Sequence, residues 1–176
     1  MAIDFTKIDY LAHGSLVQQG AYRLLLRHKL FDRLAPFDPV LAGTFPLDLV
    51  VKGSDLDVLC CFDDAARFAS EVVLRFGHEA GFSIQSTLID AQQTVVANFS
   101  LESYPIEIFG QSVPVTDQQA FRHLLIEYAL LVRHGESFKE RVLQRKRKGI
   151  KTEPALAQLL GLEGDPHQAL FDYQLP

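Results

Sequence analysis

The chain has few cysteines, no apolar run of membrane length and no excess of positive charge. Its two cysteines, Cys60 and Cys61, are adjacent inside an apolar run. Neighbouring strand residues point to opposite faces, so a disulfide between these two is geometrically poor. No apolar run reaches the roughly 18 residues that a transmembrane helix needs, and the N-terminus lacks a signal-peptide pattern. We therefore expect reduced thiols in a cytoplasmic protein that has no membrane partner.

The charge balance argues against a broad nucleic-acid surface. The formal net charge is −5 and the isoelectric point is about 5.6, so nucleic acid is not expected as a partner. One segment, 139–151, is strongly basic, but no aromatic residues are interleaved with its charges for base stacking. This segment is either a solvated helix face or a clamp for phosphate or an acidic partner.

The pattern of hydrophobic residues predicts a mixed α/β (α+β) fold in a single domain, 1–176. The chain has 176 residues, of which 48% are hydrophobic, with no repeat and no linker. We expect a core over 1–114, including an N-terminal helix, and a C-terminal helical subdomain over 115–176. The predicted elements are a helix at 15–34, strands at 39–43 and 55–62, a helix at 65–76, strands at 83–90, 93–101 and 105–110, and helices from 115 onward.

Two carboxylates at the start of the apolar strand 55–62 are the first chemical signal. Asp55 and Asp57 would share one strand face, about 6.6 Å apart, while Leu56 and Val58 face the core. Like charges oppose each other's ionisation, and a divalent cation would neutralise both. An Asp-x-Asp pair alone is weak evidence for a functional site, because strand starts often carry acidic residues at the solvent edge.

Glu107 supplies a third carboxylate. It lies between Ile106 and Ile108, so in a strand it faces away from both isoleucines. If strands 55–62 and 105–110 are neighbours, Asp55, Asp57 and Glu107 converge. Oxygen ligands around an open space suit Mg²⁺ or Mn²⁺, with substrate phosphates completing the coordination.

A glycine turn precedes these acids. Gly43 allows close backbone approach to a phosphate, and the Thr44 hydroxyl and backbone N–H groups can bind its oxygens. Ser54 either shapes the turn before Asp55 or contacts a phosphate. The six histidines show no tight metal-binding spacing, and we expect His123 to be at the surface or half-buried.

Gly43-Thr44, Asp55-Leu56-Asp57 and Glu107 together resemble the signature of the nucleotidyltransferase superfamily, which has the polymerase-beta-like fold. Two departures are visible: threonine replaces the usual serine or glycine after Gly43, and the third acid is a glutamate. Over nearly the whole chain, the motifs at 43–46, 54–57 and 149–155 resemble an uncharacterised bacterial family of this superfamily. Members of that family are sometimes labelled diadenosine tetraphosphate hydrolase.

The resemblance implies a nucleotidyltransferase-like sheet and a metal-dependent transfer of a nucleoside monophosphate from a nucleoside triphosphate. Asp55, Asp57 and Glu107 would hold Mg²⁺ or Mn²⁺ and act in catalysis, while Gly43 and Thr44 with Ser54 would bind the nucleotide. The acceptor would be a small molecule or a protein. Two alternatives stay open: a hydrolase of dinucleoside polyphosphates at the same metal site, and a non-catalytic nucleotide-binding or regulatory module.

Overall fold

The computed structural model describes residues 3–89 and 91–173. Its α-helices and strands follow one another along the chain in the expected order, so the mixed α/β fold is confirmed. They are α1 (Leu16–Arg27), α2 (Leu30–Leu34), β1 (Val40–Ala42), β2 (Leu56–Cys61), α3 (Ala65–Phe76), β3 (Ala80–Ile89), β4 (Gln92–Leu101), β5 (Tyr104–Gln111), α4 (Gln119–Arg147), α5 (Thr152–Leu160) and α6 (Pro166–Asp172). Short 3₁₀ helices at Asp9–His13, Ala35–Phe37 and Val115–Asp117 complete the set.

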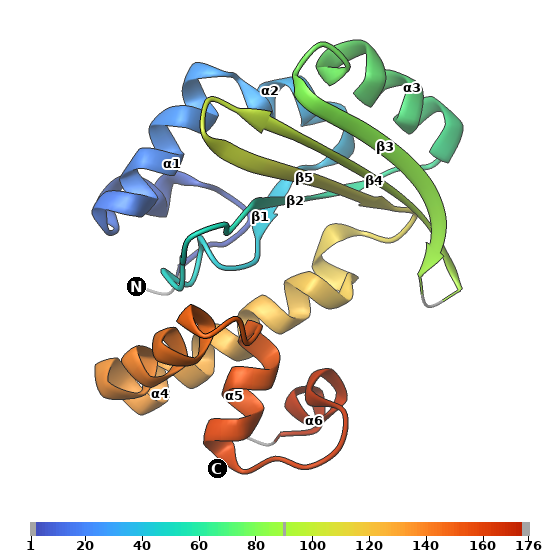
Figure 1. Ribbon diagram of the computed structural model, residues 1–176. Helices are drawn as coiled ribbons and strands as arrows, with labels where there is room; N and C mark the ends of the chain where they lie inside the picture. The colour runs from blue at the N-terminus through green and yellow to red at the C-terminus, as the bar shows by residue number, and fades with distance from the viewer. Residues whose placement is uncertain (1–2, 90, 174–176) are drawn as a thin grey trace.

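The five strands form one mixed sheet in the order β1-β2-β5-β4-β3. β2 and β5 run parallel, and every other neighbouring pair is antiparallel. Figure 1 shows α1, α2 and α3 above the sheet and α4, α5 and α6 below it. The sheet therefore presents one face to each group of helices.

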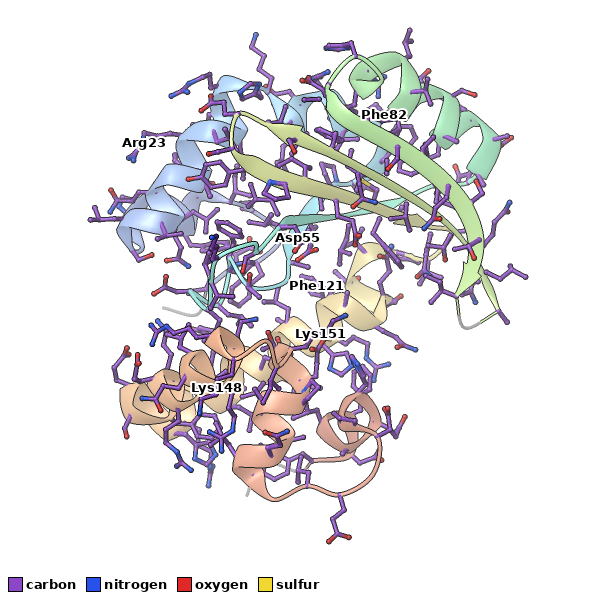
Figure 2. The ribbon with its side chains drawn as sticks, viewed as in Figure 1. Arg23, Asp55, Phe82, Phe121, Lys148 and Lys151 are labelled. Atoms are coloured by element: carbon purple, nitrogen blue, oxygen red, sulfur yellow. The ribbon has the colours of Figure 1, made fainter. Side chains whose placement is uncertain are left out.

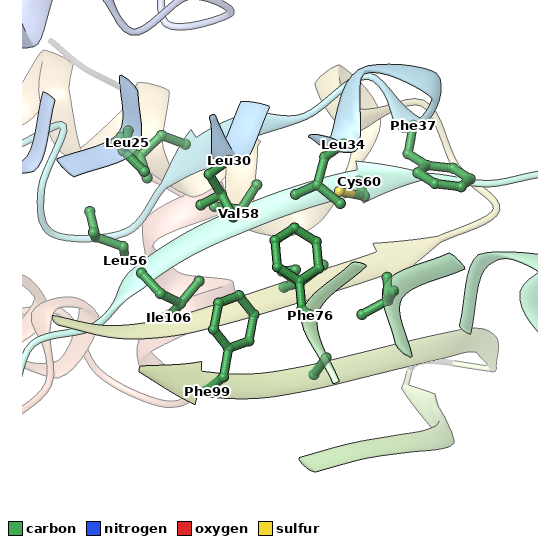
Figure 3. Packing of buried hydrophobic residues seen from close by; sticks show 14 of the residues in the cluster. Leu25, Leu30, Leu34, Phe37, Leu56, Val58, Cys60, Phe76, Phe99 and Ile106 are labelled. Atoms are coloured by element: carbon green, nitrogen blue, oxygen red, sulfur yellow. The ribbon is translucent and has the colours of Figure 1, made fainter. Parts of the chain in front are cut away.

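The upper face of the sheet packs against the covering helices in the larger of the two hydrophobic clusters. Alternate residues of β2 and β5, such as Val58 and Ile106, are fully or almost fully buried against it. Figure 3 shows Leu25, Leu30 and Phe76 of the covering helices packed over these strands. Because strand side chains alternate, Asp57 and Glu107 must face the other side, toward α4–α6.

The lower face joins the sheet to the C-terminal helices through a second apolar cluster. It combines strand residues such as Val40 and Leu59 with Phe138, Leu156 and Leu170 from α4, α5 and α6. α4 bends at Gly135, whose φ of 74° and ψ of −171° interrupt the helical geometry. Gly135 divides α4 into two helical halves, and each half carries buried residues.

The expected helix 15–34 is broken into two. Lys29 adopts a left-handed conformation with φ of 50° and separates α1 from α2. No glycine or proline marks this break in the sequence. Both cysteines are free and Cys60 is buried, as expected of buried thiols, whereas Cys61 is partly exposed and departs from that expectation.

We propose that the chain is a single domain, 1–176, in which the core over 1–114 depends on the helical subdomain over 115–176 for its stability. Deleting 136–176 removes the buried side chains of Phe138, Val142, Leu156 and Leu170. Each is worth roughly 1.5–3 kcal/mol, against a total stability of about 5–15 kcal/mol. We expect fragment 1–135 to be insoluble or to melt without cooperativity, measured by circular dichroism against a chain ending at Tyr173. A soluble fragment with a sharp transition would show that the tail is a separate unit.

Candidate functional site

The parallel pairing of β2 and β5 brings the expected carboxylates together. Asp57 is the register partner of Glu107, so the two side chains lie on the same face of adjacent strands. Asp55 lies just before β2 begins at Leu56 and acts electrostatically on both of the other acids. The three acids thus occupy one end of the lower sheet face.

Burial and mutual repulsion disfavour ionisation of two of these acids. Desolvation, followed by the charges of Asp55, Glu107 and Glu153, raises the pKa of Asp57 to about 8. Desolvation and then Asp55 raise the pKa of Glu107, with Lys151 opposing. A positive charge at this point of the sheet would relieve the repulsion.

A closed protein cage for a metal ion is not present. Within residues 3–89 and 91–173, no group of three or more His, Cys, Asp or Glu side chains is gathered closely enough to hold an ion. Mg²⁺ keeps several waters and is usually bound by one or two carboxylates together with substrate phosphates. Asp57 and Glu107, with Asp55 beside them, offer the hard oxygen donors that fit such an open site.

The Gly43–Thr44 turn lies directly against this carboxylate pair. Ala42 is the register partner of Asp57, and Gly43 follows it with φ of +71°. A Cβ atom at position 43 would collide with the Asp57 carboxylate, so both the conformation and the space require glycine. The Thr44 hydroxyl oxygen is buried and has no hydrogen-bond partner among the described residues.

Contacts from α1 and α4 hold the loop after this turn. Asp48 accepts hydrogen bonds from the Ser15 hydroxyl at 2.6 Å and from Lys139 Nζ at 2.8 Å. Gln18 Nε2 donates to the Phe45 carbonyl at 2.8 Å. Lys139 therefore serves as an anchor and is not a free member of the basic segment.

Ser54 shapes its own turn. Its hydroxyl oxygen accepts a hydrogen bond from the Val51 N–H at 3.0 Å. A role in nucleotide binding stays a prediction for Ser54, as it does for Gly43 and Thr44.

The helical side contributes charges of both signs opposite the acids. Lys146 is 8% exposed, donates to the Thr152 hydroxyl at 2.7 Å and acts electrostatically on Asp57. Figure 2 shows Lys151 on the helical side, below Asp55 on the sheet side. Glu153, two residues later, adds negative charge near Asp57. Two members of the basic segment thus act on the acids, although burial lowers the pKa of Lys146.

Sequence patterns missed the polar row that extends from these acids. Glu107 is the register partner of Asn98 on β4, and Asn98 is that of Ser83 on β3. Both side chains are exposed. Because register partners share a face, the row continues outward from Asp57 across the lower side of the sheet. Only the pairing of β3, β4 and β5 could have revealed it.

The expectation for His123 is wrong. Its side chain is 6% exposed, and its ring packs on Phe171 with the centroids 3.9 Å apart. α6 folds back onto α4 and covers it, which the spacing of His123 on its own helix could not show.

Several solved structures are similar to this chain in fold. No sequence among the curated proteins matches the chain. Cid1 poly(U) polymerase with MgGTP bound is similar at a TM-score of 0.53 and 17% identity, over 73% of this chain and 41% of that one. A mutant of that polymerase bound to MgATP is similar at a TM-score of 0.50 and 18% identity, over 73% of this chain and 41% of that one. A further Cid1 structure is similar at a TM-score of 0.50 and 18% identity, over 81% of this chain and 45% of that one.

These similarities establish a nucleotidyltransferase-like fold, and the chain spans less than half of the length of those structures. None of the helices within the described ranges has the length and apolar character required to span a bilayer. The sequence of residues 23–173 matches a family described as a domain of unknown function, DUF4269. The chain belongs to the DUF4269 family.

Proposed function

We propose that this protein is a metal-dependent nucleotidyltransferase that transfers a nucleoside monophosphate from a nucleoside triphosphate to a small-molecule or protein acceptor. The observation that carries the proposal is the register pairing of Asp57 with Glu107, with the Gly43 turn against Asp57. Burying like charges side by side is unfavourable unless a ligand compensates for it. The similar structures with MgGTP and MgATP support the same ligand class.

Each site residue has a role in this reaction. Asp55, Asp57 and Glu107 would hold Mg²⁺ or Mn²⁺, which when bound neutralises phosphate charge and orients the substrate. The backbone at Gly43, the Thr44 hydroxyl and Ser54 would bind the triphosphate. An acceptor oxygen attacks the α-phosphorus, the bond from that phosphorus to the oxygen bridging the α- and β-phosphates breaks, and pyrophosphate leaves.

Glu107 is the candidate to take the acceptor's proton. Burial and the charge of Asp55 raise its pKa in the metal-free protein, and a bound cation would lower it again, so Glu107 would activate the acceptor either directly or through the metal. Its position on β5, with Asp57 beside it and open sheet face beyond it, leaves room for an acceptor. Water in place of that acceptor would make the protein a hydrolase, so the products decide between the two reactions.

The first test is the pH dependence of stability without ligand. A raised Asp57 pKa means that the folded state keeps a proton which the unfolded state loses near its ordinary value of 3.8. Stability should therefore fall as pH rises from about 4 to about 8, at no more than about 1.4 kcal/mol per pH unit for one group. Asp57→Asn should weaken this slope and raise the melting temperature at pH 8.

The control for this test is Asp63→Asn, which removes an exposed acid just beyond β2. It should leave the slope as in the unmodified protein. The dependence of stability on pH is measured by thermal or urea unfolding between pH 4 and pH 8. If it has the same slope in Asp57→Asn as in the unmodified protein, the raised pKa of Asp57 is contradicted.

The second test is metal-dependent nucleotide binding. Mg²⁺ or Mn²⁺ with a nucleoside triphosphate should stabilise the fold by about 2.7 kcal/mol at a hundredfold excess over the dissociation constant. Asp55→Asn and Asp57→Asn should lose this gain, while Asp63→Asn keeps it. Glu107→Gln should reduce turnover more than affinity.

Mass analysis of the products separates the candidate reactions. Pyrophosphate with a nucleotidylated acceptor indicates transfer, and free nucleotides alone indicate hydrolysis. Binding without either product would favour the regulatory module. The enzyme proposal fails if several triphosphates at millimolar concentration, with either metal, leave the melting temperature unmoved.

A further inference from the structure

The last strand of the sheet, β3, forms an open edge ten residues long. Figure 1 shows it as the outermost strand of the sheet, beyond β4. Among residues 3–89 and 91–173, the backbone of the segment 83–89 pairs only with β4. Because successive residues of a paired strand direct their N–H and C=O groups to opposite sides, every second residue of this segment presents both groups outward.

The segment 83–89 lacks the features that normally protect such an edge from pairing. Charged side chains, proline, a β-bulge and a short strand are the common ones. The sequence of β3, Ala-Gly-Phe-Ser-Ile-Gln-Ser-Thr-Leu-Ile, has no charged residue and no proline. Its irregularity lies between Ala80 and Ser83 and leaves 83–89 in regular register with β4. The edge is therefore able to accept another strand.

The opposite edge of the same sheet is protected. β1 has only three residues, Val40–Ala42, and all three are buried. α4 packs against it. One edge of the sheet is thus short and covered, whereas the other is long and uncharged, and this difference indicates that β3 is an interaction surface.

Exposed apolar side chains accompany the open edge. Phe82 and Ile84 pack against the upper core, so strand alternation places Leu88 on the upper face and Ile89 on the lower face. Leu88 is 71% exposed and Ile89 is 38% exposed. The edge therefore offers apolar surface on both faces as well as unpaired backbone groups.

α3 extends this surface above the sheet. Arg75 Nη1 donates to the Arg33 carbonyl of α2 at 2.8 Å, so that flank of α3 faces α2. At about 100° per residue, Val73 lies on the opposite flank. α3 packs on β4 and also contacts β3, and Figure 1 shows it on the β3 side of α2. Val73 is 45% exposed, and its flank, which includes Ala66 and Ser70, carries no charge.

We propose that β3 pairs with β3 of a second copy of this chain, antiparallel about a two-fold axis, so that two five-stranded sheets become one. The charge distribution favours this partner. Each copy has a formal net charge of −5, so most surfaces of two copies repel each other. Along β3 and the Val73 flank of α3, identical surfaces meet with no like charges opposed. The two-fold axis pairs each surface with itself.

The regular segment also fits its own copy in register. Its middle residue is Ser86, so pairing about Ser86 uses the whole of 83–89. On the upper face, exposed Leu88 then meets Ile84 of the second copy, and on the lower face Gln85 meets Thr87 of the second copy. Cross-strand pairs of this kind stabilise sheets by roughly 0.2–1 kcal/mol each. The same symmetry brings the two α3 helices toward each other on their Val73 flanks.

The dimer would place both candidate sites on one side of a continuous sheet. An antiparallel pair has its two-fold axis perpendicular to the sheet, so both lower faces point the same way. β5 and its copy are five strand spacings apart, about 24 Å across the strands. The dimer itself requires neither nucleotide nor metal.

The first test is the oligomeric state of the protein without ligands. Sedimentation velocity from micromolar to nearly millimolar concentration should show a reversible monomer–dimer equilibrium. Ser86 is exposed, so Ser86→Lys should leave the monomer folded. It opposes two ammonium groups at the axis and should raise the dimer dissociation constant at least tenfold.

The matched control is Ser103→Lys, at an exposed position in the turn between β4 and β5. That turn lies beyond the level of Ala80, which is roughly 20 Å along β3 from Ser86. Ser103→Lys should dimerise like the unmodified protein. The melting temperatures of both variants at low concentration check that each monomer is folded.

Cross-linking tests the register directly. In a Cys61→Ser background, Ser86→Cys places two thiols on opposite sides of the axis. Directly opposed residues have Cα atoms about 4.5–5.5 Å apart, within the range for a disulfide. Diamide should oxidise the two thiols to a disulfide and give a covalent dimer on a non-reducing gel. Ser103→Cys in the same background should stay monomeric.

Amide hydrogen exchange identifies the surface that is covered. The outward amides of 83–89 should exchange more slowly as the protein concentration rises. A chain that is monomeric throughout overturns the proposal, as does a dimer that resists Ser86→Lys and gives no Ser86→Cys cross-link. If the chain stays monomeric and a synthetic peptide of residues 83–89 slows these amides, the edge accepts an extended peptide and not a second copy. None of these failures affects the proposed function, because no measurement uses nucleotide.

Discussion

The parallel pairing of β2 with β5 constrains everything around the candidate site. It sets Asp57 opposite Glu107 on adjacent strands, where burial first and then the charge of Asp55 raise the pKa of both carboxyls. The same alternation places Val58 and Ile106 in the upper core. A shift in register by one residue would bury the acids under α1–α3 and expose the isoleucines. The hydrophobic core therefore fixes the direction in which the carboxylates point.

Positioning of the glycine turn depends on tertiary contacts. Asp48 connects the loop after Thr44 to Ser15 beside α1 and to Lys139 on α4. The turn is thus held from both sides of the sheet, by an N-terminal helix and by a helix of the C-terminal half. A nucleotide-binding role for Gly43 and Thr44 would explain why a short loop has contacts from two distant segments.

Much of the fold was predictable because strand alternation and helix periodicity are local signals. The acids on one face of β2, the isoleucines flanking Glu107 and the order of elements all follow from such patterns. The burial of His123 under α6 and of Lys146 beside Thr152 was not predictable, since both depend on how helices far apart in the chain pack. The left-handed turn at Lys29 was not predictable either, because no residue type in the sequence marks it.

The charges between the sheet and the helices bear on the proposed chemistry. Asp55, Asp57, Glu107 and Glu153 interact electrostatically in this space, and only Lys146 and Lys151 oppose them among the groups that shift the two raised carboxyls. Lys146 is buried and donates to the Thr152 hydroxyl, so this lysine is not free to meet a triphosphate. An anionic nucleotide would meet net repulsion here, and partial protonation of Asp57 and Glu107 only reduces it. A divalent cation entering with the nucleotide reverses the sign of the interaction, so the electrostatics of the proposed site support the proposed metal dependence.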